Sequence, residues 1–148
     1  MTDDRRAEAR RILLVGGALG VVALAYLLAL RHRTDYPGHF LAGYGATLGA
    51  VGLLALTLPE RARGAAFGPV VAAATLLCVA GGAGLEGSVF RLARFDPVDF
   101  FNQSLGAALA GLSVLVAAPT GRVPPATAAF GSLVSVAATA AGFFLAFR

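Results

Sequence analysis

Apolar residues occur along this chain in five long runs, separated by short stretches that hold most of the charged residues. The runs cover residues 12–30, 38–58, 69–87, 98–117 and 126–147. Each is close to the roughly 20 residues that a helix needs to cross the hydrocarbon core of a bilayer. The prolines fall at the edges of the runs, where they suit the beginning of a helix or the stretch after its end. The pattern therefore predicts an all-α, polytopic membrane helix bundle of about five transmembrane helices, in a single domain over residues 1–148.

The composition agrees with a membrane protein. Hydrophobic residues make up 57% of the chain, charged residues 14%, and the mean hydropathy is +0.76. A soluble domain carries about 25% charged residues, and a soluble fold this small could not bury so much apolar surface. The net charge of +4 does not indicate nucleic-acid binding, because all the basic residues are arginines that lie around the apolar runs. The single Cys78 permits no internal disulfide.

The arginines also predict how the protein is inserted. The first run follows four arginines, as in a signal peptide, but it is longer than a usual signal core and no small-x-small cleavage site ends it. We therefore expect an uncleaved first helix. With five crossings, one membrane face would hold seven arginines and the other five, which predicts a cytoplasmic N-terminus in the cell membrane.

Small residues form seams along two of the runs. In the second run the seam consists of Gly38, Ala42, Gly45, Gly49 and Gly52, and in the fourth of Gly106, Ala110 and Ser113. Such seams let membrane helices approach closely. We expect contacts within one chain rather than dimerisation, with the two seams bringing the second and fourth helices together.

The remaining polar residues gather at one membrane face, because alternate helix ends emerge on the same side. The candidate functional residues are Asp35, His39, Glu86, Arg91, Arg94, Asp99 and Asn102. Ionisable groups at membrane depth are costly unless paired, and are functional candidates by default. Two acidic residues also have a purely structural explanation. Asp96, followed by Pro97, predicts a helix N-cap, and Asp35 before Pro37 could cap another helix.

We expect two contacts within this set. Glu86 lies at the negative end of a helix and requires a cation, for which Arg94 is the preferred partner over Arg91. His39 is expected to lie opposite Asp99 or Asn102. A lone histidine with carboxylates spread over three helices is a weak metal signal, so we expect neither a metal nor a cofactor.

These residues resemble the VanZ-like membrane protein family. The resemblance rests on Asp35-x-x-x-His39-Phe40 before a glycine-rich helix, and on Glu86, Arg94, Asp99, Asn102 and Gly106 at spacings of 8, 5, 3 and 4. It spans about residues 35–111, and departs from the family at Val89, where a glutamine is usual. The resemblance implies a small multi-helix bacterial membrane protein, linked through the founding member to resistance to the glycopeptide antibiotic teicoplanin. The biochemical activity of the family is not settled.

Three functions are compatible with the sequence. In the first, a polar pocket at the outer membrane face binds a lipid-linked or amphiphilic ligand, with Arg91 and Arg94 attracting an anionic headgroup. In the second, the protein is an intramembrane hydrolase or transferase that uses His39 with Glu86 or Asp99. In the third, it is a structural subunit with a membrane-protein partner. The first is preferred, because no established catalytic motif is present, and the sequence leaves open whether any reaction is catalysed.

Overall fold

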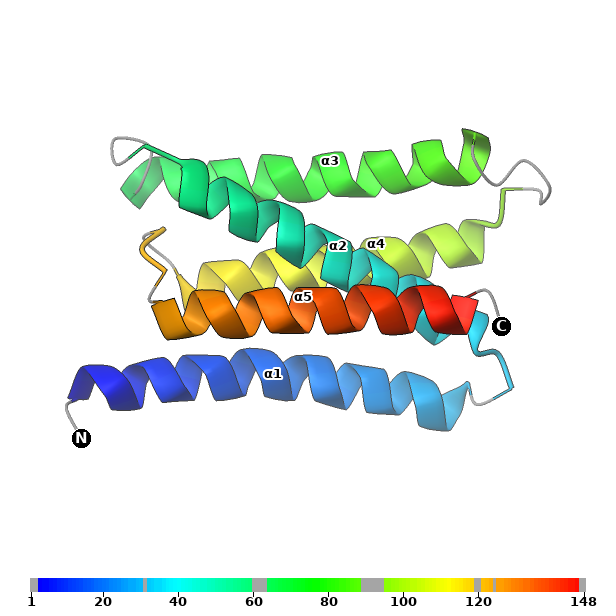
Figure 1. Ribbon diagram of the computed structural model, residues 1–148. Coiled ribbons are helices and arrows are strands. Elements are labelled where there is room, and N and C mark those ends of the chain that lie inside the picture. Colours follow the sequence, from blue (N-terminus) through cyan, green and yellow to red (C-terminus); the bar gives the residue numbers. More distant parts are fainter. Residues whose placement is uncertain are drawn as a thin grey trace.

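The described part of the chain is an all-helical bundle (Figure 1). The computed structural model describes residues 3–30, 32–59, 64–88, 95–118, 121–123 and 125–146, and gives the backbone alone for residues 3–5, 8, 9, 12–16, 27 and 86–88. No strand occurs within these ranges. The predicted fold class is therefore confirmed.

Five α-helices run alternately up and down the bundle (Figure 1). They are α1 (Asp3–Ala29), α2 (Asp35–Thr57), α3 (Phe67–Ser88, after the short 3-10 helix η2 at Gly64–Ala66), α4 (Pro97–Ala117) and α5 (Pro125–Ala146). Four of them match the predicted runs to within three residues at each end. The first begins nine residues earlier than its apolar run, because the charged N-terminal residues continue the same helix.

The bundle spans a membrane. Four stretches are long and apolar enough to cross a bilayer: Asp35–Thr57, Gly64–Leu85, Pro97–Ala117 and Pro125–Ala146. In α1 the described apolar stretch is the shorter Gly17–Tyr26, so a fifth crossing stays a prediction.

The two expected helix caps have different outcomes. The Asp96 carboxylate accepts a hydrogen bond of 2.8 Å from the Val98 amide, and Pro97 occupies the first turn of α4, so this N-cap is confirmed. The expected cap at Asp35 is wrong. The residue before α2 is Thr34, which makes no side-chain cap, and the Asp35 carboxylate instead binds the Arg33 guanidinium.

Helix α2 is the centre of the packing, with α4 on one side and α5 on the other. At Gly106 the α4 backbone comes so close to α2 that a Cβ there would collide with the Phe40 carbonyl oxygen. The Phe40 and Tyr44 side chains are fully buried beside this crossing, and the Tyr44 hydroxyl donates a 3.2 Å hydrogen bond to the Ser113 Oγ. The Gly106 seam therefore does bring α4 onto α2, as expected.

The small-residue seam of α2 packs against α5, which corrects the expectation that it faces α4. A Cβ on Gly38 would lie 2.6 Å from the Ala146 amide nitrogen, and one on Gly45 would lie 2.7 Å from the Ser135 carbonyl oxygen. The Ser135 hydroxyl also donates a 2.7 Å hydrogen bond to the Gly45 carbonyl. The face of α2 that meets α4 is a different one, on which Phe40 and Tyr44 lie. Because both contacts are internal, the seams serve packing within one chain.

We expect Gly106→Ala to destabilise the bundle by about 1–3 kcal/mol, since overpacking a close helix crossing forces the backbones apart. Gly52→Ala is the matched control, because a Cβ there meets no atom within 4 Å. That variant should be neutral or gain up to about 1 kcal/mol from helix propensity. Unfolding in a denaturing detergent, followed by circular dichroism, measures both. Equal stabilities of the two variants would contradict the close crossing.

Candidate functional site

Helix α1 ends at the same end of the bundle at which α2 and α4 begin (Figure 1). Four polar side chains from these three helices make contacts there. They are Tyr26, His39, Asp99 and Asn102, which we name the polar cluster. Two of them share one face of α4, because residues three apart in a helix are neighbours. The alternation of the helices thus brings together residues more than seventy positions apart in sequence.

Asn102 is the most buried member, with 4% of its surface exposed. It lies about 8 Å along α4 from Pro97, at the rise of 1.5 Å per residue of an α-helix. Its Oδ1 accepts a 2.6 Å hydrogen bond from the Tyr26 hydroxyl. The Tyr26 ring is in turn stacked on Phe40, with the ring centroids 5.0 Å apart. Phe40 therefore positions the phenol that orients the Asn102 amide.

His39 and Asp99 form the second contact of the cluster, between α2 and α4. The His39 Nε2 lies 3.4 Å from the Asp99 Oδ2, and the two side chains are 21% and 18% exposed. His39 was expected opposite Asp99 or Asn102, and the structure confirms the first of these two partners. A carboxylate beside an imidazole holds the orientation of the ring.

Two atoms of the cluster have no hydrogen-bond partner among the described residues although they are buried. They are the Asp99 Oδ1, an acceptor, and the Asn102 Nδ2, a donor. Unsatisfied polar groups in a membrane cost several kcal/mol each. The helix-capping explanation does not account for them, because the cap of α4 is Asp96. The described residues therefore leave one hydrogen-bond acceptor and one donor of the cluster without a partner.

An ion pair at the start of α2 flanks the cluster, with its arginine in the connection that leads from α1. The Arg33 guanidinium binds the Asp35 carboxylate through two hydrogen bonds of 3.2 and 2.9 Å, and its Cζ lies 4.1 Å from the centroid of the Tyr36 ring. The Asp35 carboxylate raises the pKa of Arg33 above its ordinary value. Because Asp35 balances the charge of Arg33, the described residues around the cluster have little net positive charge.

The other predicted site residues are not placed. Arg91 and Arg94 lie outside the described residues, and only the backbone of Glu86 is described. The expected Glu86–Arg94 pair therefore stays a prediction. The structure adds Tyr26 and Arg33, which the sequence reasoning missed. A tyrosine one turn before the end of an apolar run was an available signal, because a phenol at such a place requires a polar partner.

Comparisons with known proteins give no further assignment: no protein-family model, curated protein or solved structure matches this chain. Nor do the described residues contain a group of three or more His, Cys, Asp or Glu side chains that could hold a metal ion.

Removing the Tyr26 hydroxyl tests the internal geometry of the cluster. Tyr26→Phe keeps the stack on Phe40 but takes the donor from Asn102, so we expect a loss of about 0.6–2 kcal/mol, the range for hydrogen bonds between membrane helices. Tyr36→Phe, which keeps the ring beneath Arg33, is the matched control and should cost less. Detergent unfolding measures both variants. If Tyr26→Phe is as stable as the unmodified chain, the 2.6 Å contact carries no energy.

Proposed function

We propose that this chain is a VanZ-like integral membrane protein whose polar cluster binds the head of a lipid-linked or amphiphilic ligand. The observation that carries the proposal is the buried, unpartnered pair formed by the Asp99 Oδ1 and the Asn102 Nδ2. The two side chains project from the same face of α4, one turn apart, so a single ligand group can reach both. Closing the site with a ligand would remove the cost of leaving two polar atoms unsatisfied in the membrane.

The hydrogen-bonding pattern of the pair specifies the class of group that fits. A hydroxyl or an amide donates to the Asp99 carboxylate and accepts from the Asn102 amide at once, and is complementary in a way that a purely accepting group is not. An anionic part of the headgroup would depend on Arg91 and Arg94, as the sequence predicts. A sugar or peptide unit attached to a lipid phosphate offers both a group that donates and accepts hydrogen bonds and an anionic group.

The cellular context follows from the resemblance and the arginine pattern, and belongs to the proposal. The N-terminus lies in the cytoplasm, the polar cluster faces outward, and the membrane is that of a bacterium. The ligand then belongs to the cell envelope, and the activity contributes to resistance to glycopeptide antibiotics.

Intramembrane catalysis is the second candidate, and the 3.4 Å contact between His39 and Asp99 favours it. A histidine oriented by a carboxylate is the usual arrangement of a general base. In this alternative His39 takes a proton from the group that is bound between Asp99 and Asn102, and the pair on α4 positions that group.

Exchanging the donor and the acceptor tests ligand binding. Asn102→Asp keeps the oxygen that accepts from Tyr26 but replaces the Nδ2 donor, and Asp99→Asn replaces a carboxylate oxygen with an amide. We expect each to reduce the lipids that copurify with the protein about tenfold or more, equivalent to 1.4 kcal/mol or more, as measured by native mass spectrometry. Asp96→Ser, which keeps a capping oxygen at the start of α4, is the matched control.

His39→Gln separates binding from catalysis in the same experiment. If the His39→Gln protein still binds lipid but no longer converts it, the result favours the enzyme. If the lipid is lost, the result favours binding alone. Unchanged lipid in both α4 variants would contradict the proposed site.

Orientation is tested by a single introduced thiol. In a Cys78→Ala background, Ser88→Cys at the end of α3 should react with a membrane-impermeant maleimide added to intact cells. A cysteine placed at Ala65, in η2 just before the opposite end of α3, is the control and should react only after lysis. The reverse pattern would place the polar cluster on the cytoplasmic face.

A further inference from the structure

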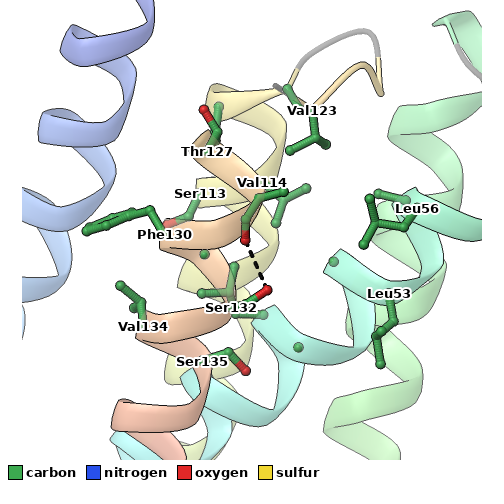
Figure 2. Close-up of a pocket in the computed structure, with 18 of the residues that line it drawn as sticks. Leu53, Leu56, Ser113, Val114, Val123, Thr127, Phe130, Ser132, Val134 and Ser135 are labelled. Atoms are coloured by element: carbon green, nitrogen blue, oxygen red, sulfur yellow. Dashed lines mark hydrogen bonds between the residues drawn. The ribbon is translucent and has the colours of Figure 1, made fainter. Parts of the chain in front are cut away.

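A cavity lies between α2, α4 and α5 (Figure 2). It is at the end of the bundle opposite to the polar cluster. Its walls are the C-terminal halves of α2 and α4 and the N-terminal half of α5, and its volume is about 270 Å³. Leu53 and Leu56 line it from α2, Val114 from α4, and Thr127 and Ser132 from α5 (Figure 2). Neither the polar cluster nor the proposed function uses this space.

The cavity exists because α2 and α5 diverge. Their contact is tight at Gly38 and Gly45, and a Cβ on Gly49 would still lie 2.7 Å from the Ser135 Oγ. One turn farther along the same seam, a Cβ on Gly52 meets no atom within 4 Å, and the same holds for Gly131 on the α5 wall. The seam therefore closes at one end only, and leaves a wedge-shaped space at the other.

None of the described residues that line the cavity has a buried side-chain polar atom without a hydrogen-bond partner, in contrast to the polar cluster. The Ser135 hydroxyl donates to the Gly45 carbonyl at 2.7 Å, and the Ser132 hydroxyl donates to the Ala128 carbonyl at 3.0 Å. Among the described residues that line the cavity, none is charged. Apolar cavities stay dry and take up apolar molecules, so the walls favour an apolar occupant.

The mouth of the cavity opens toward the bilayer, near basic residues. Leu53, Leu56 and Val136 line the cavity and are more than half exposed, so its wall is continuous with the membrane-facing surface. Arg122, next to the lining residue Val123, is exposed at the same end of the bundle. The N-terminus of α1, where Arg10 and other arginines are exposed, lies at this end too (Figure 1).

We propose that this cavity holds one acyl chain of an anionic phospholipid from the leaflet at the N-terminal end, with the lipid headgroup beside Arg122. The size of the cavity favours an acyl chain over a helix of a partner protein. A helix about 10 Å across with a 5.4 Å pitch fills roughly 400 Å³ per turn, whereas benzene fits a cavity of about 150 Å³. The proposal depends on the bundle spanning a membrane, and not on the function proposed for the polar cluster.

Fluorescence quenching by brominated lipids tests the proposal directly, because the chain has no tryptophan. A single tryptophan replaces Phe130, which lines the cavity, and the protein is reconstituted with a minor fraction of phosphatidylglycerol or phosphatidylcholine brominated in the acyl chains. We expect Phe130→Trp to be quenched more strongly by the brominated phosphatidylglycerol at equal lipid fraction. The control Leu133→Trp, at an exposed position outside the lining, should be quenched equally by both.

A second substitution in the tryptophan variants distinguishes binding of the acyl chain from binding of the lipid headgroup. Gly52→Leu fills the cavity and should lower the quenching of Phe130→Trp to the level of Leu133→Trp, whereas Gly81→Leu, on an exposed part of α3, should not. Arg122→Gln should remove the preference for phosphatidylglycerol and leave the remaining quenching in place. The proposal fails if both tryptophans respond alike to the two lipids, or if Gly52→Leu changes nothing. It fails also if Phe130→Trp is shielded from both lipids, since a protein segment then covers the cavity.

Discussion

The close crossing of α4 over α2 at Gly106 is the contact on which the rest of the structure depends. No side chain separates the two backbones there, so the residues one turn away on each helix are brought together. Asn102 and Asp99 on α4 thereby come to lie against His39 and the stacked pair of Tyr26 and Phe40. In a membrane, where helices gain little from hydrophobic burial against one another, such van der Waals contact is a main source of association.

The two ends of the bundle have opposite chemistry for one geometrical reason. Helix α2 meets α4 and α5 on different faces, and both contacts are tightest in its N-terminal half. That end holds the polar cluster, in which the Asp99 Oδ1 and the Asn102 Nδ2 are buried and have no described partner. The other end diverges and leaves an apolar cavity beside Arg122. The two ends of the described bundle thus differ in chemistry: one carries buried polar atoms, and the other an apolar cavity.

Much of the fold follows from the sequence, because hydropathy and proline placement are local signals. The helix bounds and the Asp96 cap are of this kind. Topology and the shared helix faces predicted His39 opposite Asp99 or Asn102, and the structure shows Asp99. The packing of the Gly38 seam on α5 was not predictable, because a small-residue stripe shows that a face is approached and not which helix approaches it. Tyr26 was missed for a related reason. Whether its hydroxyl faces Asn102 depends on the rotation of α1 about its axis, which neighbouring helices set.

The most direct test of the central claim is an experimental structure of the protein in a lipid bilayer, at a resolution that shows bound lipid around α4. The account predicts non-protein density in hydrogen-bond contact with both the Asp99 Oδ1 and the Asn102 Nδ2, continuous with an amphiphile at that membrane face. If a protein group such as the Arg91 or Arg94 side chain occupies this position instead, the cluster is an internal clasp and the binding function is contradicted.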